Sequence, residues 1–331
     1  MKNKVCISHK EDVDGVSSAA LIKTAFEVNT VILVDYANMI KTLRSMVSSV
    51  QEGTKKIDEL YVCDLGLSKK NENEFVKILK QMIEAKCSVT YIDHHDLDKK
   101  LLAELKKSGV KLLHSTKECT TIHIYNKYKR KFGSYQAFLA AAAALTDYLE
   151  TRPIASNLVS RFDRQFLMLE ATALSYMISS SQHDSDFLAT IVEDLSQKKY
   201  PHDIEGGFQR AERHARKVLT VVKSIENSII LAKNLAHVQI NSELPSSMVV
   251  NFVLGTSGKP VALVYKAKDD INSCIISIRG SNECKVHLGR IVNDLSSALS
   301  GSGGGHEKAC GAVIPKDKFP EFIKQLDKKS R

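Results

Sequence analysis

Apolar, strand-like runs alternate with helical segments along the first 115 residues, and this alternation constrains the fold more than any other feature. The runs are VCIS, VILVDY, ELYVCDL, SVTYID and VKLLHS, which begin at residues 5, 31, 59, 88 and 110. Such alternation predicts an α/β domain built on a parallel sheet. Functional sites in these sheets lie at the carboxyl ends of the strands, near the point where the strand order reverses.

The rest of the chain changes character twice. Residues 118–200 have a mostly helical pattern, including the alanine-rich SYQAFLAAAAALTDYLE. Later runs predict strands at AHVQINS, SMVVNFVL, PVALVYKA and NSCIISIRG, a helix from about residue 286, a turn at GSGGG, a strand at ACGAVIP and a terminal helix. We therefore expect a parallel-sheet domain with helical additions at 1–200, a long connector helix at 201–236, and a smaller α/β domain with a mixed sheet at 237–331.

The composition indicates a soluble protein with an anionic partner. Lys and Arg outnumber Asp and Glu by 47 to 38, which favours nucleic acid or smaller phosphorylated molecules as substrate or partner. No apolar run approaches the ~18 residues of a membrane span and no signal-peptide pattern is seen, so we expect a cytoplasmic protein that does not contact a membrane. The seven cysteines are scattered and never form C-x-x-C, which predicts buried free thiols.

Acidic residues and histidines gather where the predicted strands of the first domain end. One such residue is ordinarily a turn former or a helix cap, but four separate groups are harder to explain in this way. Oxygen-rich sets with one or two imidazoles suit Mg²⁺ or Mn²⁺, and the histidines favour Mn²⁺. Two ions roughly 3.5–4 Å apart can stabilise both the attacking and the leaving oxygen of a phosphoryl displacement. The candidates are His9, Asp12 and Asp14, then Asp64, then Asp93, His94 and His95, then Asp147.

Other acidic residues near these groups are predicted to be structural. Asp96 and Asp98 are expected to cap the helix that follows them. The HDSD run at 183–186 lies in a predicted connection between helices, where a solvated loop is expected. Asp35 has the right place in the sheet but matches no motif, so it is interpreted as a rim residue.

The second domain contains a pattern suited to anion binding. GSGGG would ordinarily be a flexible turn, but consecutive glycines before a histidine let backbone N–H groups approach a phosphate closely. Arg279, at the end of a predicted strand, can add a two-pronged contact to the same anion.

Together these motifs resemble the DHH phosphoesterase superfamily, and the resemblance spans nearly the whole chain. It is carried by the DxDG element at 12–15, Asp64 in VCDLG, the Asp-His-His triplet at 93–95, Asp147, and GGGH at 303–306. The resemblance implies a two-metal hydrolase followed by a DHH-associated substrate-binding domain. The expected cofactor is a pair of Mn²⁺ ions, for which Mg²⁺ can substitute.

The resemblance also implies roles for individual residues. Asp64 is expected to bridge the two ions and Asp12 to bind one of them. The other ion is expected to be held by Asp14, His94 and Asp147. His9 is a further expected ligand, Asp93 is expected to orient an imidazole, and His95 to face the scissile phosphate. The substrate's nucleotide end is expected to contact Arg279, Gly303, Gly304, Gly305 and His306, with Lys308 as a weaker candidate.

The implied activity is exonucleolytic cleavage of single-stranded RNA or DNA, including short oligonucleotides, as in the RecJ-like and nanoRNase branches. The expected direction is 3′ to 5′, with release of nucleoside monophosphates. One alternative is a phosphodiesterase for cyclic dinucleotides or for linear products such as pApA, or a phosphatase for 3′-phosphoadenosine 5′-phosphate. A different class is an inactive scaffold in a replication complex, which the retained ligand residues argue against. Replication or repair proteins are the expected protein partners.

Overall fold

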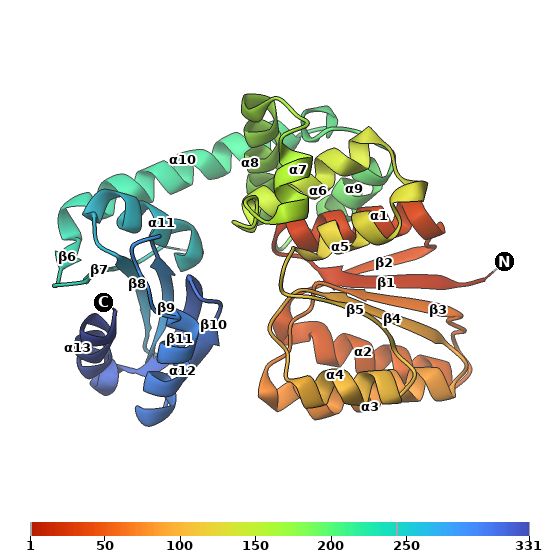
Figure 1. Ribbon diagram of the computed structural model, residues 1–331, viewed down its shortest axis with the longest axis horizontal. Coiled ribbons are helices and arrows are strands. Elements are labelled where there is room, and N and C mark those ends of the chain that lie inside the picture. Colours follow the sequence, from red (N-terminus) through yellow and green to blue (C-terminus); the bar gives the residue numbers. More distant parts are fainter. Residues whose placement is uncertain (1, 243, 331) are drawn as a thin grey trace. The chain divides into compact units, whose positions relative to one another are not determined.

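The computed structural model describes residues 2–242 and 244–330 and confirms an α/β fold with two separate sheets (Figure 1). The chain divides into two compact units, an N-terminal unit of residues 1–214 and a C-terminal unit of residues 215–331. The division lies inside helix α10 (Gly207–Ile225). The domain boundaries suggested by the sequence stay predictions.

The N-terminal unit is built on a parallel five-stranded sheet in the order β2-β1-β3-β4-β5. Each strand coincides with one of the five predicted runs. The chain passes from β1 outward to β2 and then back across β1 to β3, so the strand order reverses between β1 and β3. The strands are β1 (Lys4–His9), β2 (Thr30–Val34), β3 (Glu59–Cys63), β4 (Ser88–Asp93) and β5 (Lys111–His114).

Helices cover both faces of this sheet and enclose two separate cores (Figure 1). Alternate residues of a strand point to opposite faces, so Cys6 belongs to one core while Val5 and Ile7 belong to the other. One face is covered by α1 (Val13–Phe26), α5 (Thr120–Lys127), α6 (Ser134–Thr146), α7 (Pro153–Val159), α8 (Arg164–Ser180) and α9 (Ser185–Ser196). The other is covered by α2 (Tyr36–Gln51), α3 (Lys69–Glu84) and α4 (Lys99–Lys107). Short 3₁₀ turns are η1 (Lys129–Lys131) and η2 (Pro201–Asp203).

The C-terminal unit contains the predicted mixed sheet, in the order β10-β11-β9-β8-β7-β6. Only the β7–β8 pair is parallel among its described strands. Its strands are β6 (Ile230–Leu231), β7 (Leu235–Gln239), β8 (Val261–Lys268), β9 (Ser273–Gly280), β10 (Ser302–Gly305) and β11 (Ala309–Pro315). Its other elements are η3 (Glu226–Ser228), α11 (Ser246–Ser257), α12 (Leu288–Ala298), η4 (Lys316–Lys318) and α13 (Phe319–Lys329). Of the helices in the described parts of the chain, none combines the length and the apolarity that a membrane span requires.

Three local predictions for the C-terminal half are wrong. SMVVNFVL forms helix α11, because Val249, Val250 and Val253 bury one helical face, which a continuous apolar run does not distinguish from a strand. GSGGG is the edge strand β10 rather than a turn, paired with β11 along residues 302–305. The connector helix ends at Ile225, and strands β6 and β7 follow within the predicted helical range.

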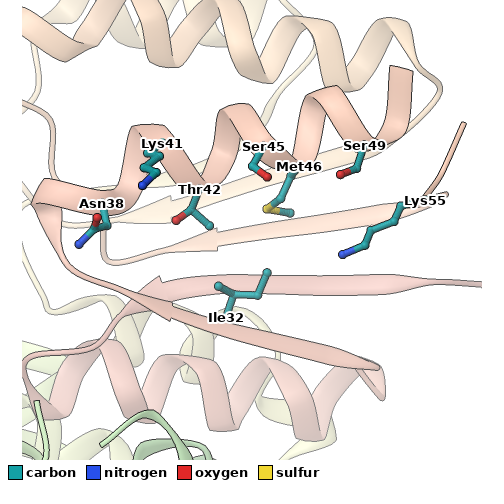
Figure 2. Close-up of a pocket in the computed structure, with 8 residues that line it drawn as sticks. All are labelled: Ile32, Asn38, Lys41, Thr42, Ser45, Met46, Ser49 and Lys55. Carbon is teal, nitrogen blue, oxygen red and sulfur yellow. The ribbon is translucent and has the colours of Figure 1, made fainter. Parts of the chain in front are cut away.

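A hollow of about 400 Å³ opens beside the edge strand β2, along one face of α2 (Figure 2). Most of its lining comes from α2, while Ile32 comes from β2 and Lys55 from the segment after α2. None of its residues belongs to the predicted site. They are Ile32, Asn38, Lys41, Thr42, Ser45, Met46, Ser49 and Lys55.

Candidate active site

The ends of β1, β3 and β4 lie side by side at the point where the strand order reverses. Their register brings His9, Asp64 and Asp93 out at one edge of the sheet. The backbone N–H of Asp64 donates to the carbonyl of Ile92 at 3.0 Å. Asp64 has a φ of 54°, a left-handed conformation that costs a residue other than glycine about 1–3 kcal/mol.

His94 lies at the centre of a carboxylate cluster. Its Nε2 atom is 3.4 Å from Asp147 Oδ2 and 3.5 Å from Asp64 Oδ1. Asp14 Oδ2 is 3.9 Å from the same nitrogen. Asp14 lies in the first turn of α1, and Asp147 is the C-cap residue directly after α6. The fold therefore brings together four side chains that are widely separated in the sequence.

His9 and Asp12 form a neighbouring part of the same site. His9 Nε2 lies 3.5 Å from Asp12 Oδ2 and 3.7 Å from Glu11 Oε2. Asp12 caps α1 through its other oxygen, Oδ1, which accepts the N–H of Gly15 at 2.9 Å. A Cβ atom on Gly15 would lie 2.3 Å from the carbonyl oxygen of His9, so only glycine permits this close approach. The turn thus holds His9 against the start of α1.

The start of α5 holds two of the carboxylates in place. The backbone N–H groups of Thr120 and Thr121 donate to the two oxygens of Asp14, each at 2.8 Å. The Thr120 hydroxyl donates to Asp64 Oδ1 at 2.9 Å. The sequence reasoning missed both threonines. The ECTT run before an apolar helical segment was the available signal, because a helix start offers free N–H groups to an anion.

His95 is held by a buried acidic residue and a close glycine. Its Nδ1 atom lies 2.9 Å from Asp93 Oδ1, and the other Asp93 oxygen accepts the Tyr91 hydroxyl at 3.0 Å. A Cβ atom on Gly66 would lie 2.6 Å from His95 Cγ, so the backbone there packs directly against the ring. Burial opposes protonation, but the charge and hydrogen bond of Asp93 outweigh it and raise the pKa of His95 to about 9.

The ionisation of the cluster reflects crowded negative charge in a buried place. Burial and the neighbouring carboxylates raise the pKa of Asp64 and of Asp147 well above the usual range. Burial also opposes ionisation of Asp14, but His94 and the hydrogen bonds from the start of α5 lower its pKa. Burial lowers the pKa of His94 and favours the neutral imidazole, which is the form that binds metals.

These residues fit a divalent cation. Two groups have ligand atoms within 4.8 Å of one another, Asp64 with both histidines of the triplet and Asp14 with Cys119 and Asp147. Asp147 Oδ2 is a buried atom without a hydrogen-bond partner among the described residues, as expected of a group that faces an ion. Burial and the carboxylates raise the pKa of the Cys119 thiol well above its usual value, so the protonated thiol is a poor ligand.

In the C-terminal unit, the predicted anion-binding residues gather at one edge of the sheet. Arg279 of β9 pairs with Ala309 of β11, and Gly305 of β10 pairs with the next residue of β11. The backbone N–H of His306 donates to the carbonyl of Ala309 at 2.8 Å. Gly304 and Gly305 have φ values of 150° and 135°, which favour glycine. The Lys308 ammonium donates to the carbonyl of Cys284.

Acidic residues interpreted as structural have structural contacts. Asp98 caps α4 by accepting the N–H of Lys100. Asp184 of the HDSD run caps α9, and its other oxygen pairs with Arg210 at 2.8 Å. Asp35 caps α2 and pairs with Lys10 at 3.0 Å. These contacts of Asp35 hold the next residue, Tyr36, in place at the start of α2.

Comparisons with solved structures give the same fold over 99% of this chain. A DHH-domain protein described as a member of a family of ribosomal proteins matches with a TM-score of 0.72, 14% identity and 86% of its own chain covered. A pGpG-specific phosphodiesterase of Vibrio cholerae matches with a TM-score of 0.60, 11% identity and 98% covered. RecJ of Thermus thermophilus in complex with Mn²⁺ matches with a TM-score of 0.61 and 13% identity, and this chain spans 52% of it.

The sequence itself decides the nature of the C-terminal unit, because residues 234–330 match the DHHA1 domain family. Residues 234–330 form a DHHA1 domain, and the chain has the fold of solved DHH-domain proteins. Among curated proteins, none is a significant sequence match. The DHH fold places the Asp93-His94-His95 triplet at the end of β4, in the middle of the carboxylate cluster.

Proposed function

We propose that this DHHA1 protein is a two-metal-dependent phosphodiesterase that removes nucleoside monophosphates from the 3′ end of single-stranded RNA or DNA, including short oligonucleotides. The observation that carries the proposal is the convergence of three carboxylates on His94 Nε2, at 3.4, 3.5 and 3.9 Å. Oxygen-rich ligand sets of this kind bind Mn²⁺ or Mg²⁺. A basic protein with a net charge of +9 also suits a polyanionic substrate.

The metal ligands are assigned by this proposal. Asp12 and His9 would hold one ion, Asp14, His94 and Asp147 would hold the other, and Asp64 would contribute to both. When bound, the two ions, Mn²⁺ or alternatively Mg²⁺, act as Lewis acids toward water and toward the phosphate. The left-handed backbone of Asp64 and the hydroxyl of Thr120 fix the orientation of the bridging carboxylate.

The remaining residues position the phosphate. Asp93 orients the ring of His95, which stabilises charge that develops on the phosphate oxygens. In the C-terminal unit, Arg279, His306 and the backbone N–H groups of Gly303–Gly305 bind the anionic end of one nucleotide.

A second candidate is a phosphodiesterase for linear dinucleotides, with cyclic dinucleotides and 3′-phosphoadenosine 5′-phosphate as related substrates. Its support is the likeness to a pGpG-specific phosphodiesterase along 98% of that chain. Both candidates use the same metal centre and differ in their substrates. An inactive scaffold for replication or repair proteins would have no chemical need for six converging ligand residues.

The test is a time course of hydrolysis on end-labelled RNA and DNA oligomers of several lengths, down to dinucleotides, with Mn²⁺, with Mg²⁺ and with chelator. The proposal predicts a product ladder that shortens from the 3′ end and disappears with chelator and in Asp64→Asn. Cleavage of dinucleotides alone would favour the second candidate. A folded protein that cleaves none of these substrates with Mn²⁺ would favour the scaffold.

A further inference from the structure

A line of hydrogen bonds runs from the protein core to solvent at the end of β4. Asp93 Oδ1 contacts His95 Nδ1 at 2.9 Å, and His95 Nε2 contacts the Tyr36 hydroxyl at 3.1 Å. Exposure rises along the line: the Asp93 side chain is fully buried, that of His95 is 26% exposed, and Tyr36 is 40% exposed. Both ring nitrogens of His95 are thus engaged, and the last group in the line is the tyrosine hydroxyl.

Tyr36 is held in this place from three sides. It is the first residue of α2, directly after Asp35, which caps the helix and pairs with Lys10. Its ring lies against the ring of His9, with centroids 4.5 Å apart. Its ring also meets His95 edge-on, at 6.2 Å. A phenol fixed between two histidines of the site is placed to contact whatever binds there.

We propose that the Tyr36 hydroxyl, oriented by His95 and Asp93, is the group that donates a hydrogen bond to a non-bridging oxygen of the bound phosphate. The inference rests on the proposed phosphodiester chemistry and changes the assignment of His95 from the phosphate contact to a positioning residue. A phenol is neutral near pH 7, so its O–H group donates to an anion. Its oxygen can at the same time accept from His95 Nε2.

The structure argues against a merely structural role for this hydroxyl. A hydrogen bond at an exposed position replaces one to water and adds little to stability. The tyrosine ring, in contrast, is anchored by its contact with His9 and by its position on α2. Tyr36→Phe therefore keeps the ring in place and removes only the donor.

The experiment measures binding of inorganic phosphate to the full-length, Mn²⁺-loaded protein by titration calorimetry. Tyr36→Phe is expected to weaken phosphate binding about tenfold, the loss expected for a hydrogen bond to a charged group. Tyr128→Phe is the matched control, because Tyr128 packs edge-on against Phe26 and has no contact with the site among the described residues. Its phosphate affinity and thermal midpoint are expected to equal those of the wild type.

A second variant tests the chain of contacts without touching Tyr36. His95→Gln breaks the support behind the hydroxyl, so it is expected to weaken phosphate binding to a similar extent. The two residues are proposed to act as one unit. The affinity of the double variant for phosphate is therefore expected to be at most about threefold below that of the single variant with the lower affinity. Fully multiplicative losses would show that Tyr36 and His95 contact phosphate independently and would overturn the proposal.

The role of Tyr36 and the proposed phosphodiesterase activity can be tested separately. Weaker phosphate binding in Tyr36→Phe supports the inference even when no nucleic acid is hydrolysed, a result that would count against the phosphodiesterase alone. If hydrolysis is observed, Tyr36→Phe is expected to lower kcat/KM about 10²-fold. Equal phosphate affinity in Tyr36→Phe and wild type, or no phosphate binding by the wild type, would overturn the inference.

Discussion

Gly66 shows how a single missing side chain shapes the site. A Cβ atom there would overlap the ring of His95, which cannot retreat without losing its 2.9 Å contact with Asp93. We expect Gly66→Ala to displace His95 and to lower kcat by at least about tenfold, while Mn²⁺ binding is kept. Steady-state kinetics and metal titration check both parts. Gly133→Ala is the control, since its nearest atom would lie 3.8 Å away, and full activity in Gly66→Ala would contradict the prediction.

Thr120 makes a contact that the sequence alone did not reveal. Its hydroxyl donates to Asp64 Oδ1, the carboxylate proposed to bridge the ions. Thr120→Val keeps the shape and removes this donor, so we expect Mn²⁺ affinity to fall about tenfold, as for other residues that support metal ligands. Thr120→Ser keeps the hydroxyl and is expected to bind Mn²⁺ like the wild type. Equal affinities of the Val and Ser variants in calorimetric titration would contradict this role.

Helix α12 and strand β10 lie in close contact where Gly289 of the helix meets Gly305 of the strand. A Cβ atom on Gly289 would lie 2.0 Å from the carbonyl oxygen of Gly305, so we expect Gly289→Ala to lower the free energy of unfolding by about 1–3 kcal/mol. Gly255 also lies in a helix of the C-terminal unit, but no atom would lie within 4 Å of its Cβ. Gly255→Ala is expected to raise the same quantity by about 0.5–1 kcal/mol. Denaturant unfolding measures both, and a neutral Gly289→Ala would show that the two elements can separate freely.

The strands of the N-terminal sheet were predictable because each is a short apolar run between helical segments. Helix α11 was not, because a continuous run such as SMVVNFVL suits either a buried strand or a buried helix. Strand β10 was not predictable either, because its glycines have weak strand preference and are held by pairing with β11, a tertiary contact. Local sequence preference therefore predicted the secondary structure of the N-terminal unit well and that of the C-terminal unit less well.

The same distinction applies to the site as a whole. The carboxylates and histidines were found because their types and their places at strand ends are visible in the sequence. Thr120, Thr121 and Tyr36 were missed because their importance depends on which helix starts lie beside the sheet edge, and spacing along the chain does not encode that. Residues that bind ions are thus easier to predict than the residues that position those ligands.

All seven cysteines are buried and free throughout the molecule, as predicted from their spacing. Burial raises the pKa of Cys87 and of Cys310 to about 12, so thiolate, the reactive form, is scarce even at mildly alkaline pH. We expect the native protein to react with Ellman's reagent only at its rate of unfolding, and denaturant to release all seven thiols at once. Near pH 12, a direct reaction of the folded protein is expected to appear beside the reaction that unfolding limits, because Cys87 and Cys310 are then partly ionised. A rapid native reaction near neutral pH would contradict this expectation.

The central claim is that residues far apart in the N-terminal unit form one centre for two cations. The most direct measurement is the stoichiometry of Mn²⁺ binding by titration calorimetry, combined with electron paramagnetic resonance of the loaded protein. We expect two ions per chain with the signal of a spin-coupled pair, and loss of that coupling in Asp64→Asn. A wild-type protein that binds no Mn²⁺, or a single isolated ion, would contradict it.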